Sequence, residues 1–137
     1  MAFKAILFDM DGVLVDSLGT HFYAFNAVIE KFGKKRVSLK TFHEKFWGTY
    51  IEHDLRKVFG DIVPSKMKEI VDEYALQVGE FAKYTKIYSE TKKVLTKLRE
   101  RDLKIGLVTN TQKKTVDILI KEVGLESYFD VIIYGDS

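Results

Sequence analysis

Two aspartates near the start of the chain, Asp9 and Asp11, stand where an apolar run from Phe3 to Phe8 ends. The run predicts a buried strand, and a carboxylate at the edge of a core needs a metal, a cation or hydrogen-bond donors to offset its desolvation. A metal is the partner that we expect. Because Gly12 permits a sharp turn, we expect Asp11 to bend over the tip of Asp9, so that one carboxylate attacks while the other handles protons.

The stretch that begins at Asp9 resembles motif I of the haloacid dehalogenase superfamily, as found in its phosphoglycolate phosphatase and β-phosphoglucomutase branches, and reads Asp9-Met10-Asp11-Gly12-Val13-Leu14-Val15-Asp16-Ser17. The resemblance implies that Asp9 is a nucleophile that takes up a phosphoryl group as an aspartyl phosphate. It implies that Asp11 protonates the leaving alcohol and later activates water. It also implies a Mg²⁺ ion on the Asp9 carboxylate and the Asp11 main-chain carbonyl, where it neutralises phosphate charge.

Two other kinds of segment contain an Asp-x-Asp-Gly sequence, namely a solvated acidic turn and a calcium-binding loop between two helices. The calcium loop carries Glu at its twelfth position, but the twelfth residue counted from Asp9 is Thr20. An apolar strand, rather than a helix, also precedes Asp9. These two features favour the superfamily over the alternatives.

A second motif follows about a hundred residues later, where a predicted strand from Leu103 to Val108 leads into Thr109-Asn110-Thr111. It resembles motif II of the same superfamily, in which a hydroxyl at a strand end binds a phosphate oxygen. The resemblance gives Thr109 that role, and Asn110 helps to orient the substrate. Amides at the start of the next helix would favour an anion there. Without motif I, a helix-capping Thr-Asn-Thr would be the simpler interpretation.

Several further residues are weaker candidates for contacts with a substrate. His21 lies one turn into the first predicted helix, where it could face a cleft, although such a histidine is more often on a helix surface. Three cations could bind a substrate carboxylate or a second phosphate, although such residues are usually solvated: Lys45, Arg56 and Lys57. The aromatic residues Phe42, Phe46 and Trp47 are expected to pack among the helices, and His43 and His53 are further candidates there.

The superfamily pattern also includes a Lys in motif III and acids in motif IV, and neither follows the third predicted strand before Ser137. Asp136 directly follows that strand, which makes it a poor metal-ligand candidate, and other surface cations, for instance Lys113 or Lys114, could substitute for the Lys. We therefore expect a shortened phosphatase-like chain, with a partner subunit or a retained binding role as alternatives. A strand expected beside the Asp9 strand is also absent, and the exposed edge predicts a homodimer.

The elements that must position these residues alternate between strands and helices. Residues 16–84 are expected to be all helical, with helices that end at Gly33 and Gly60, a helix capped by Ser38, and a longer one opened by Pro64. A helix capped by Ser89 and another that ends at Gly124 separate the later strands. This order predicts an α/β fold, with a Rossmann-like parallel sheet of about three strands in residues 1–15 and 85–137 and a helical cap in residues 16–84.

Composition narrows the function classes. The chain has 137 residues, a formal net charge of +2 with mixed charges, and no cysteine. It therefore offers no thiol chemistry, no basic face for a nucleic acid and no segment for a membrane, and we expect a cytoplasmic protein. The expected function is Mg²⁺-dependent hydrolysis of small phosphorylated metabolites, with phosphoglycolate as the first substrate to consider. A mutase, a dehalogenase, against which Asp11 argues, and a binding or oligomerisation module are the alternatives.

Overall fold

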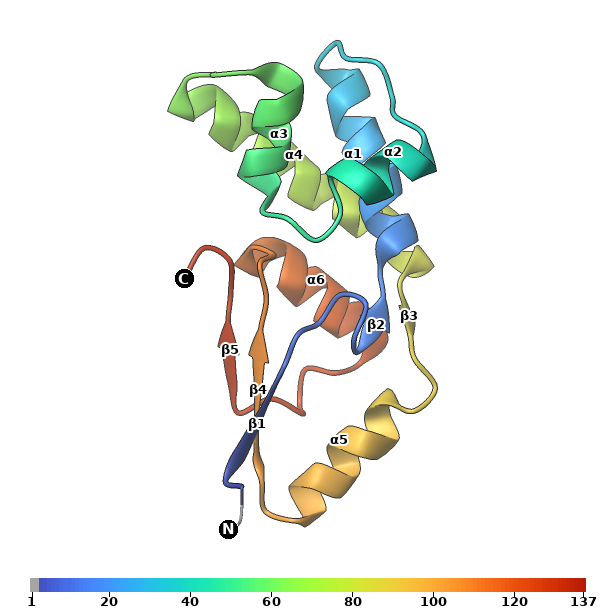
Figure 1. Cartoon of the computed structure of the whole chain (residues 1–137), viewed down its shortest axis with the longest axis vertical. Helices are drawn as coiled ribbons and strands as arrows, with labels where there is room; N and C mark the ends of the chain where they lie inside the picture. Colours follow the sequence, from blue (N-terminus) through green and yellow to red (C-terminus); the bar gives the residue numbers. More distant parts are fainter. Residues whose placement is uncertain (1–2) are drawn as a thin grey trace.

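Three parallel strands form the sheet that holds both motifs (Figure 1). The computed structural model describes residues 3–137 and places the strands in the order β1 (Ala5–Phe8), β4 (Lys104–Val108) and β5 (Val131–Ile133). Phe8 pairs with Leu107, so the carboxyl ends of β1 and β4 lie side by side. The expected α/β fold with a parallel sheet of about three strands is confirmed.

Helices make up most of the remaining chain. Figure 1 shows the first four of them grouped at one end of the molecule, beyond the sheet. Those four are α1 (Leu18–Lys31), α2 (Leu39–Lys45), α3 (Ile51–Phe59) and α4 (Pro64–Phe81), which a short 3₁₀ turn, η1 (Ala82–Tyr84), follows. The other two are α5 (Thr91–Glu100) and α6 (Lys113–Val123). No helix in the described part of the chain is both long enough and apolar enough to cross a membrane.

The expectation that residues 16–84 are entirely helical is wrong at one end. A short antiparallel ladder pairs β2 (Val15–Asp16) with β3 (Lys86–Ile87), so Asp16 belongs to a strand. Val15 is completely buried and pairs with Ile87, which gives so short a ladder an apolar anchor. Because β2 leads into α1 and β3 follows η1, the ladder holds together the two chain segments that pass between the sheet and the four helices. The division at residues 16 and 85 remains a proposal.

One of the two expected serine caps forms. The Ser38 hydroxyl accepts a hydrogen bond from the Thr41 amide at 3.1 Å, as predicted for the start of α2. Ser89 does not cap α5, because Glu90 occupies the N-cap position and its side chain makes no capping bond. The Thr91 hydroxyl instead donates to the Leu14 carbonyl at 2.7 Å. This bond ties the start of α5 to the loop that follows Asp11.

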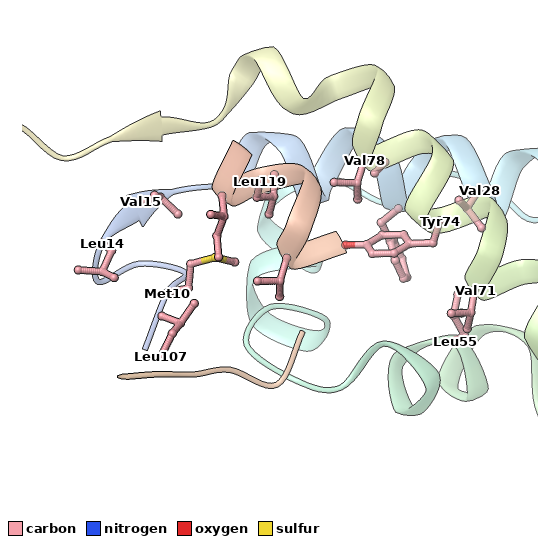
Figure 2. Close-up of a cluster of buried hydrophobic side chains, with 14 of the residues drawn as sticks. Met10, Leu14, Val15, Val28, Leu55, Val71, Tyr74, Val78, Leu107 and Leu119 are labelled. Atoms are coloured by element: carbon pink, nitrogen blue, oxygen red, sulfur yellow. The ribbon is translucent and has the colours of Figure 1, made fainter. Parts of the chain in front are cut away.

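A single cluster of buried side chains runs from the sheet into the helices. In Figure 2, Met10 lies between Leu107 of β4 and Leu119 of α6, and side chains of α1, α3 and α4 extend the cluster. A fully buried side chain of this kind contributes about 1.5–3 kcal/mol to stability. Because the sheet and the four helices share this core, packing determines how they sit against each other.

Within residues 3–137, the opposite face of the sheet is exposed. Leu7, Gly106 and Val131 are neighbours in register, and a Cβ atom on Gly106 would meet both Leu7 and Val131, so these residues share one face. Alternation along the strands puts Val108 and Ile133 on the same face. The exposed fractions of Leu7, Val131 and Ile133 are 63%, 51% and 48%. An apolar sheet face of this kind is a surface on which another element or chain can pack.

Candidate active site

The loop after β1 turns sharply at Gly12, as the sequence predicts. Gly12 has a φ of 78°, and its amide donates to the Val15 carbonyl at 2.8 Å. Met10 points into the core with 1% of its surface exposed, and its carbonyl accepts the Leu14 amide at 2.9 Å. The alternation of side chains therefore directs Asp9 and Asp11 away from the core.

Asp11 is held by three side chains rather than by Asp9. Ser17 donates its hydroxyl to Oδ1, and Thr111 donates its hydroxyl to Oδ2 at 3.1 Å. His21 Nε2 lies 3.3 Å from Oδ1. Asp9 and Asp11 line the same cavity, and the bend of Asp11 over Asp9 stays a prediction.

These contacts determine the protonation of Asp11. Burial alone would raise its pKa, but the hydrogen bond and charge of His21 and the bonds from Ser17 and Thr111 outweigh burial and lower the pKa of Asp11 below its usual value. The carboxylate is therefore ionised at neutral pH in this arrangement. A role as proton donor to a leaving alcohol requires some of these bonds to give way.

His21 is a buried link between Asp11 and α4 and not a surface residue. Its exposed fraction is 6%, and its Nδ1 contacts the Tyr74 hydroxyl. Burial raises the pKa of Tyr74 well above its usual value, so the phenol stays protonated beside Nδ1. Tyr74 thus orients His21, and His21 orients Asp11.

Asp9 and Thr109 lie at the ends of the neighbouring strands β1 and β4. Asp9 is exposed, and its Oδ1 accepts the Met10 amide at 2.7 Å. Thr109 is nearly buried, and its Oγ1 accepts the Thr111 amide at 3.1 Å. Because Gln112 is the N-cap of α6, Thr109 does not cap that helix, and its hydroxyl hydrogen can bind an acceptor.

All four predicted site residues line one cavity of about 100 Å³ between the sheet and the helices. The sheet side and the α6 start contribute Asp9, Asp11, Thr109, Asn110, Thr111 and Gln112. The helical side contributes His21, Phe25, Phe42, Phe46, Trp47, Gly48, Thr49, Ile51, Asp54 and Tyr74. Gln112 Nε2 donates to the Tyr50 hydroxyl at 3.0 Å, which bridges the two sides at the rim.

Sequence reasoning missed four residues that line or support this cavity. Ser17 and Thr111 belong to the two motif segments, but no role was predicted for them. In the structure, both hydroxyls donate to Asp11. Tyr74 and Asp54 received no role. The sequence carries no signal for these last two, because only the packing of α3 and α4 brings them to the cavity.

Lys113 and Lys114, the possible substitutes for the motif III Lys, do not line the cavity. Lys113 pairs with Asp117 at 2.7 Å and Lys114 with Asp72 at 3.0 Å. Among residues 3–137, no lysine or arginine lines the cavity. Asp136 accepts the Lys113 amide at 2.9 Å, so a carboxylate of the chain itself binds the first amide of α6, where we expected substrate phosphate.

The resemblance assigns two donors to Mg²⁺, the Asp9 carboxylate and the Asp11 main-chain carbonyl. Both are hard oxygen ligands, and Mg²⁺ in proteins commonly binds one or two carboxylates and retains several waters. The described residues hold no cluster of three or more acidic, histidine or cysteine side chains around a metal position. The donor types in this chain therefore fit Mg²⁺, and their number is two.

Comparison with curated proteins finds phosphatases. The chain is 26% identical over 140 residues to a phosphorylated carbohydrates phosphatase of Thermotoga maritima, covering 97% of this chain and 62% of that protein. It is 30% identical over 138 residues to a phosphoglycolate phosphatase of Aquifex aeolicus, covering 98% of this chain and 62% of that protein. The chain thus spans about three fifths of the length of these relatives.

Solved structures share the fold. CbbY of Rhodobacter sphaeroides, in complex with phosphate, superposes with a TM-score of 0.85 at 20% identity, over 98% of this chain and 64% of that one. The β-phosphoglucomutase of Clostridium difficile gives 0.81 at 20% identity, over 99% of this chain and 63% of that one. A family model described as haloacid dehalogenase-like hydrolase matches residues 6–137, and this chain therefore belongs to that family.

Proposed function

We propose that this chain carries the nucleophile-bearing part of a Mg²⁺-dependent phosphomonoesterase for small phosphorylated metabolites, which works through an aspartyl phosphate. The supporting observation is that Asp9, Asp11 and Thr109 meet in one cavity, at the carboxyl ends of two neighbouring parallel strands. The phosphatase activity named for the relatives supports the same chemistry. Residues 16–84 act as a cap over the core of residues 1–15 and 85–137.

In this proposal, Asp9 attacks phosphorus, and an oxygen–phosphorus bond to Asp9 forms as the bond to the leaving alcohol breaks. The Met10 amide binds Asp9 Oδ1, which orients the carboxylate and leaves Oδ2 for the attack. The Thr109 hydroxyl donates to a phosphate oxygen, and Asn110 orients the substrate. Asp11, in its protonated form, gives its proton to the leaving alcohol and is left ionised, and it then takes a proton from the water that hydrolyses the aspartyl phosphate, which restores the protonated form.

A Mg²⁺ ion bound by the Asp9 carboxylate and the Asp11 main-chain carbonyl would neutralise charge on the phosphate oxygens. The side chain of Asp11 remains outside that set, because Ser17, His21 and Thr111 already bind it. Its freedom to exchange protons then depends on those three residues, which belong to both sides of the cavity.

Hydrolysis of p-nitrophenyl phosphate by the purified 137-residue chain, with and without Mg²⁺, tests the proposal. We expect Mg²⁺-dependent turnover, and a loss of more than about a thousandfold in Asp9→Asn, because a covalent nucleophile has no substitute. Asp61→Asn, which changes an exposed aspartate outside the cavity, is the matched control and should keep the wild-type rate. Full activity of Asp9→Asn in a preparation free of other phosphatases would show that the nucleophile is another group.

A second candidate is a binding or assembly module, which the exposed apolar sheet face favours. In that role, the chain would associate through the edge of β1 and the adjoining face and would not turn over phosphate esters. An ordered dimer without Mg²⁺-dependent hydrolysis would support this candidate. A monomer that hydrolyses p-nitrophenyl phosphate when Mg²⁺ is present would contradict it.

A further inference from the structure

The helical wall of the cavity holds a buried carboxylate that the proposed mechanism does not use. Asp54 lies in the first turn of α3, has an exposed fraction of 2%, and lines the same cavity as Asp9 and Asp11. Burying a carboxylate costs free energy unless donors or cations compensate for it. The contacts of its two oxygens therefore show what Asp54 can still bind.

The two oxygens of Asp54 differ. Oδ1 accepts a hydrogen bond from the Thr49 hydroxyl and lies 3.5 Å from Lys57 Nζ. Oδ2 has no partner within residues 3–137, and no side-chain oxygen or nitrogen in that range is both fully buried and unpaired. Oδ2 is therefore not fully buried, and Asp54 lines the cavity.

Lys57 does not fill this space. Its side chain is 38% exposed, it does not line the cavity, and its amino group also donates to the Lys45 carbonyl at 2.6 Å. It therefore contacts Asp54 from the outer side. Burial raises the pKa of Asp54 in spite of Thr49 and Lys57, so a further donor on the cavity side would stabilise the charged form.

The other residues that line the cavity also favour a hydrogen-bond donor over an anion on the substrate. The charged or titratable side chains in the lining, apart from the phenol of Tyr74, are three carboxylates and the His21 imidazole. Beside Asp54, the lining includes the rings of Phe42, Phe46 and Trp47, and aromatic faces favour ammonium groups and the apolar faces of polyols over anions. A carboxylate or second phosphate on the substrate would meet like charge here.

We propose that Asp54 selects the alcohol part of the substrate, accepting a hydrogen bond at Oδ2 from a hydroxyl or ammonium group and disfavouring alcohols that carry a second anion. The inference rests on the proposed phosphomonoesterase function, whose substrate class it narrows. It points away from phosphoglycolate, which the sequence resemblance put first, and towards phosphate esters of polyols or amino alcohols.

Three two-carbon phosphate esters test the proposal, because they differ only at the end remote from phosphate: phosphoglycolate, 2-hydroxyethyl phosphate and phosphoethanolamine. Binding to the 137-residue chain is measured by calorimetry with Mg²⁺ present, and kcat/KM is measured wherever turnover occurs. At least one donor-bearing ester should bind about tenfold or more tightly than phosphoglycolate, since it can donate a hydrogen bond to the Asp54 carboxylate whereas phosphoglycolate brings a like charge. The ratio between the two donor-bearing esters tells whether hydroxyl or ammonium is the natural group.

Asp54→Asn should reduce that preference at least about fivefold, because the amide keeps the shape of the carboxylate but loses its charge. Asp61→Asn, the same change at an exposed position of residues 16–84, should leave it unaltered. Preference for phosphoglycolate in the wild-type chain, or an unaltered preference in a folded Asp54→Asn variant, would overturn the proposal. Selective binding without hydrolysis would uphold it and count against the proposed catalysis, whereas equal failure of all three esters to bind would overturn both.

Discussion

Asp11 shows how much of this site is built by contacts between distant residues. Its carboxylate receives bonds from Ser17 in the motif I segment, from His21 in α1 and from Thr111 after β4. The phenol of Tyr74, from α4, orients the imidazole in turn. The position of Asp11, a residue that the sequence marks as a catalytic candidate, thus depends on polar neighbours whose role the sequence does not predict.

Tyr74→Phe tests this chain of contacts. The substitution keeps the ring but leaves the buried Nδ1 of His21 without a partner, so we expect the free energy of unfolding to fall by about 1–3 kcal/mol. Urea unfolding measures the change. Tyr84→Phe, at a tyrosine that is 47% exposed, is the control and should change stability by less than about 0.5 kcal/mol. Equal stability of the two variants would show that the Tyr74 bond is not formed in solution.

Asp130 gives a pH dependence. The Ile105 amide donates to Asp130 Oδ2 at 2.8 Å, and this bond lowers the pKa of Asp130 below its usual value of 3.8, with Arg99 and Lys104 assisting. A lowered pKa in the folded state means that the stabilisation is present above pH 3.8 and is lost as the pH falls through the folded pKa. Thermal unfolding from pH 7 to pH 2.5 should therefore show a smaller acid loss in Asp130→Asn than in the wild type. Parallel curves would contradict this prediction.

At the scale of elements, the end of β5 and the loop after β4 approach each other closely. A Cβ atom on Gly135 would lie 2.0 Å from the Asn110 carbonyl oxygen, whereas one on Gly79 of α4 would lie 4.0 Å from Ile118. The Asn110 side chain in turn lies 3.5 Å from the Gly48 carbonyl across the cavity. The position of the loop after β4 therefore depends on Gly135, a glycine in a different segment.

Alanine at these two glycines should have opposite effects. Gly135→Ala forces backbone away from backbone, so we expect a loss of about 1–3 kcal/mol in stability and weaker phosphate binding. Gly79→Ala relieves the entropic penalty of glycine in a helix and should gain about 0.5–1 kcal/mol. Denaturant unfolding of both variants, with phosphate titration of the first, measures these effects. A gain in stability from Gly135→Ala would show that the two loops are farther apart in solution.

At the scale of the whole molecule, one sheet face is packed and the other is exposed within residues 3–137. The packed face carries the core shared with the helices, and the exposed face presents Leu7, Val131 and Ile133 beside the free edge of β1. We propose that this surface associates with a second copy of the chain. Lysine at an exposed sheet edge opposes such pairing, because it brings a charge into the contact.

Leu7→Lys tests the association. Analytical ultracentrifugation should show concentration-dependent dimers for the wild-type chain and a shift of at least about tenfold towards monomer for the variant. Leu76→Lys changes a leucine on α4 that is 66% exposed and is the control, which should leave the dimer unaffected. A wild-type chain that stays monomeric at all accessible concentrations would contradict the homodimer.

The sequence by itself determined the parts of this protein that local pattern encodes. The apolar run before Asp9, the glycines at helix ends and the strand before Thr109 led to the α/β fold, to the family, and to four residues that share one cavity. Those predictions hold because strands, helices and turns follow from nearest-neighbour chemistry, and because parallel strands bring their carboxyl ends to one edge. Tertiary structure alone decided that His21 and Tyr74 hold Asp11, that Asp54 faces the cavity, and that Lys113 and Lys114 pair elsewhere. Except for the pair of Lys113 with Asp117, which lies within α6, these arrangements form only when α1, α3 and α4 pack against the sheet and α6. Spacing and composition do not specify which residues of distant helices will meet.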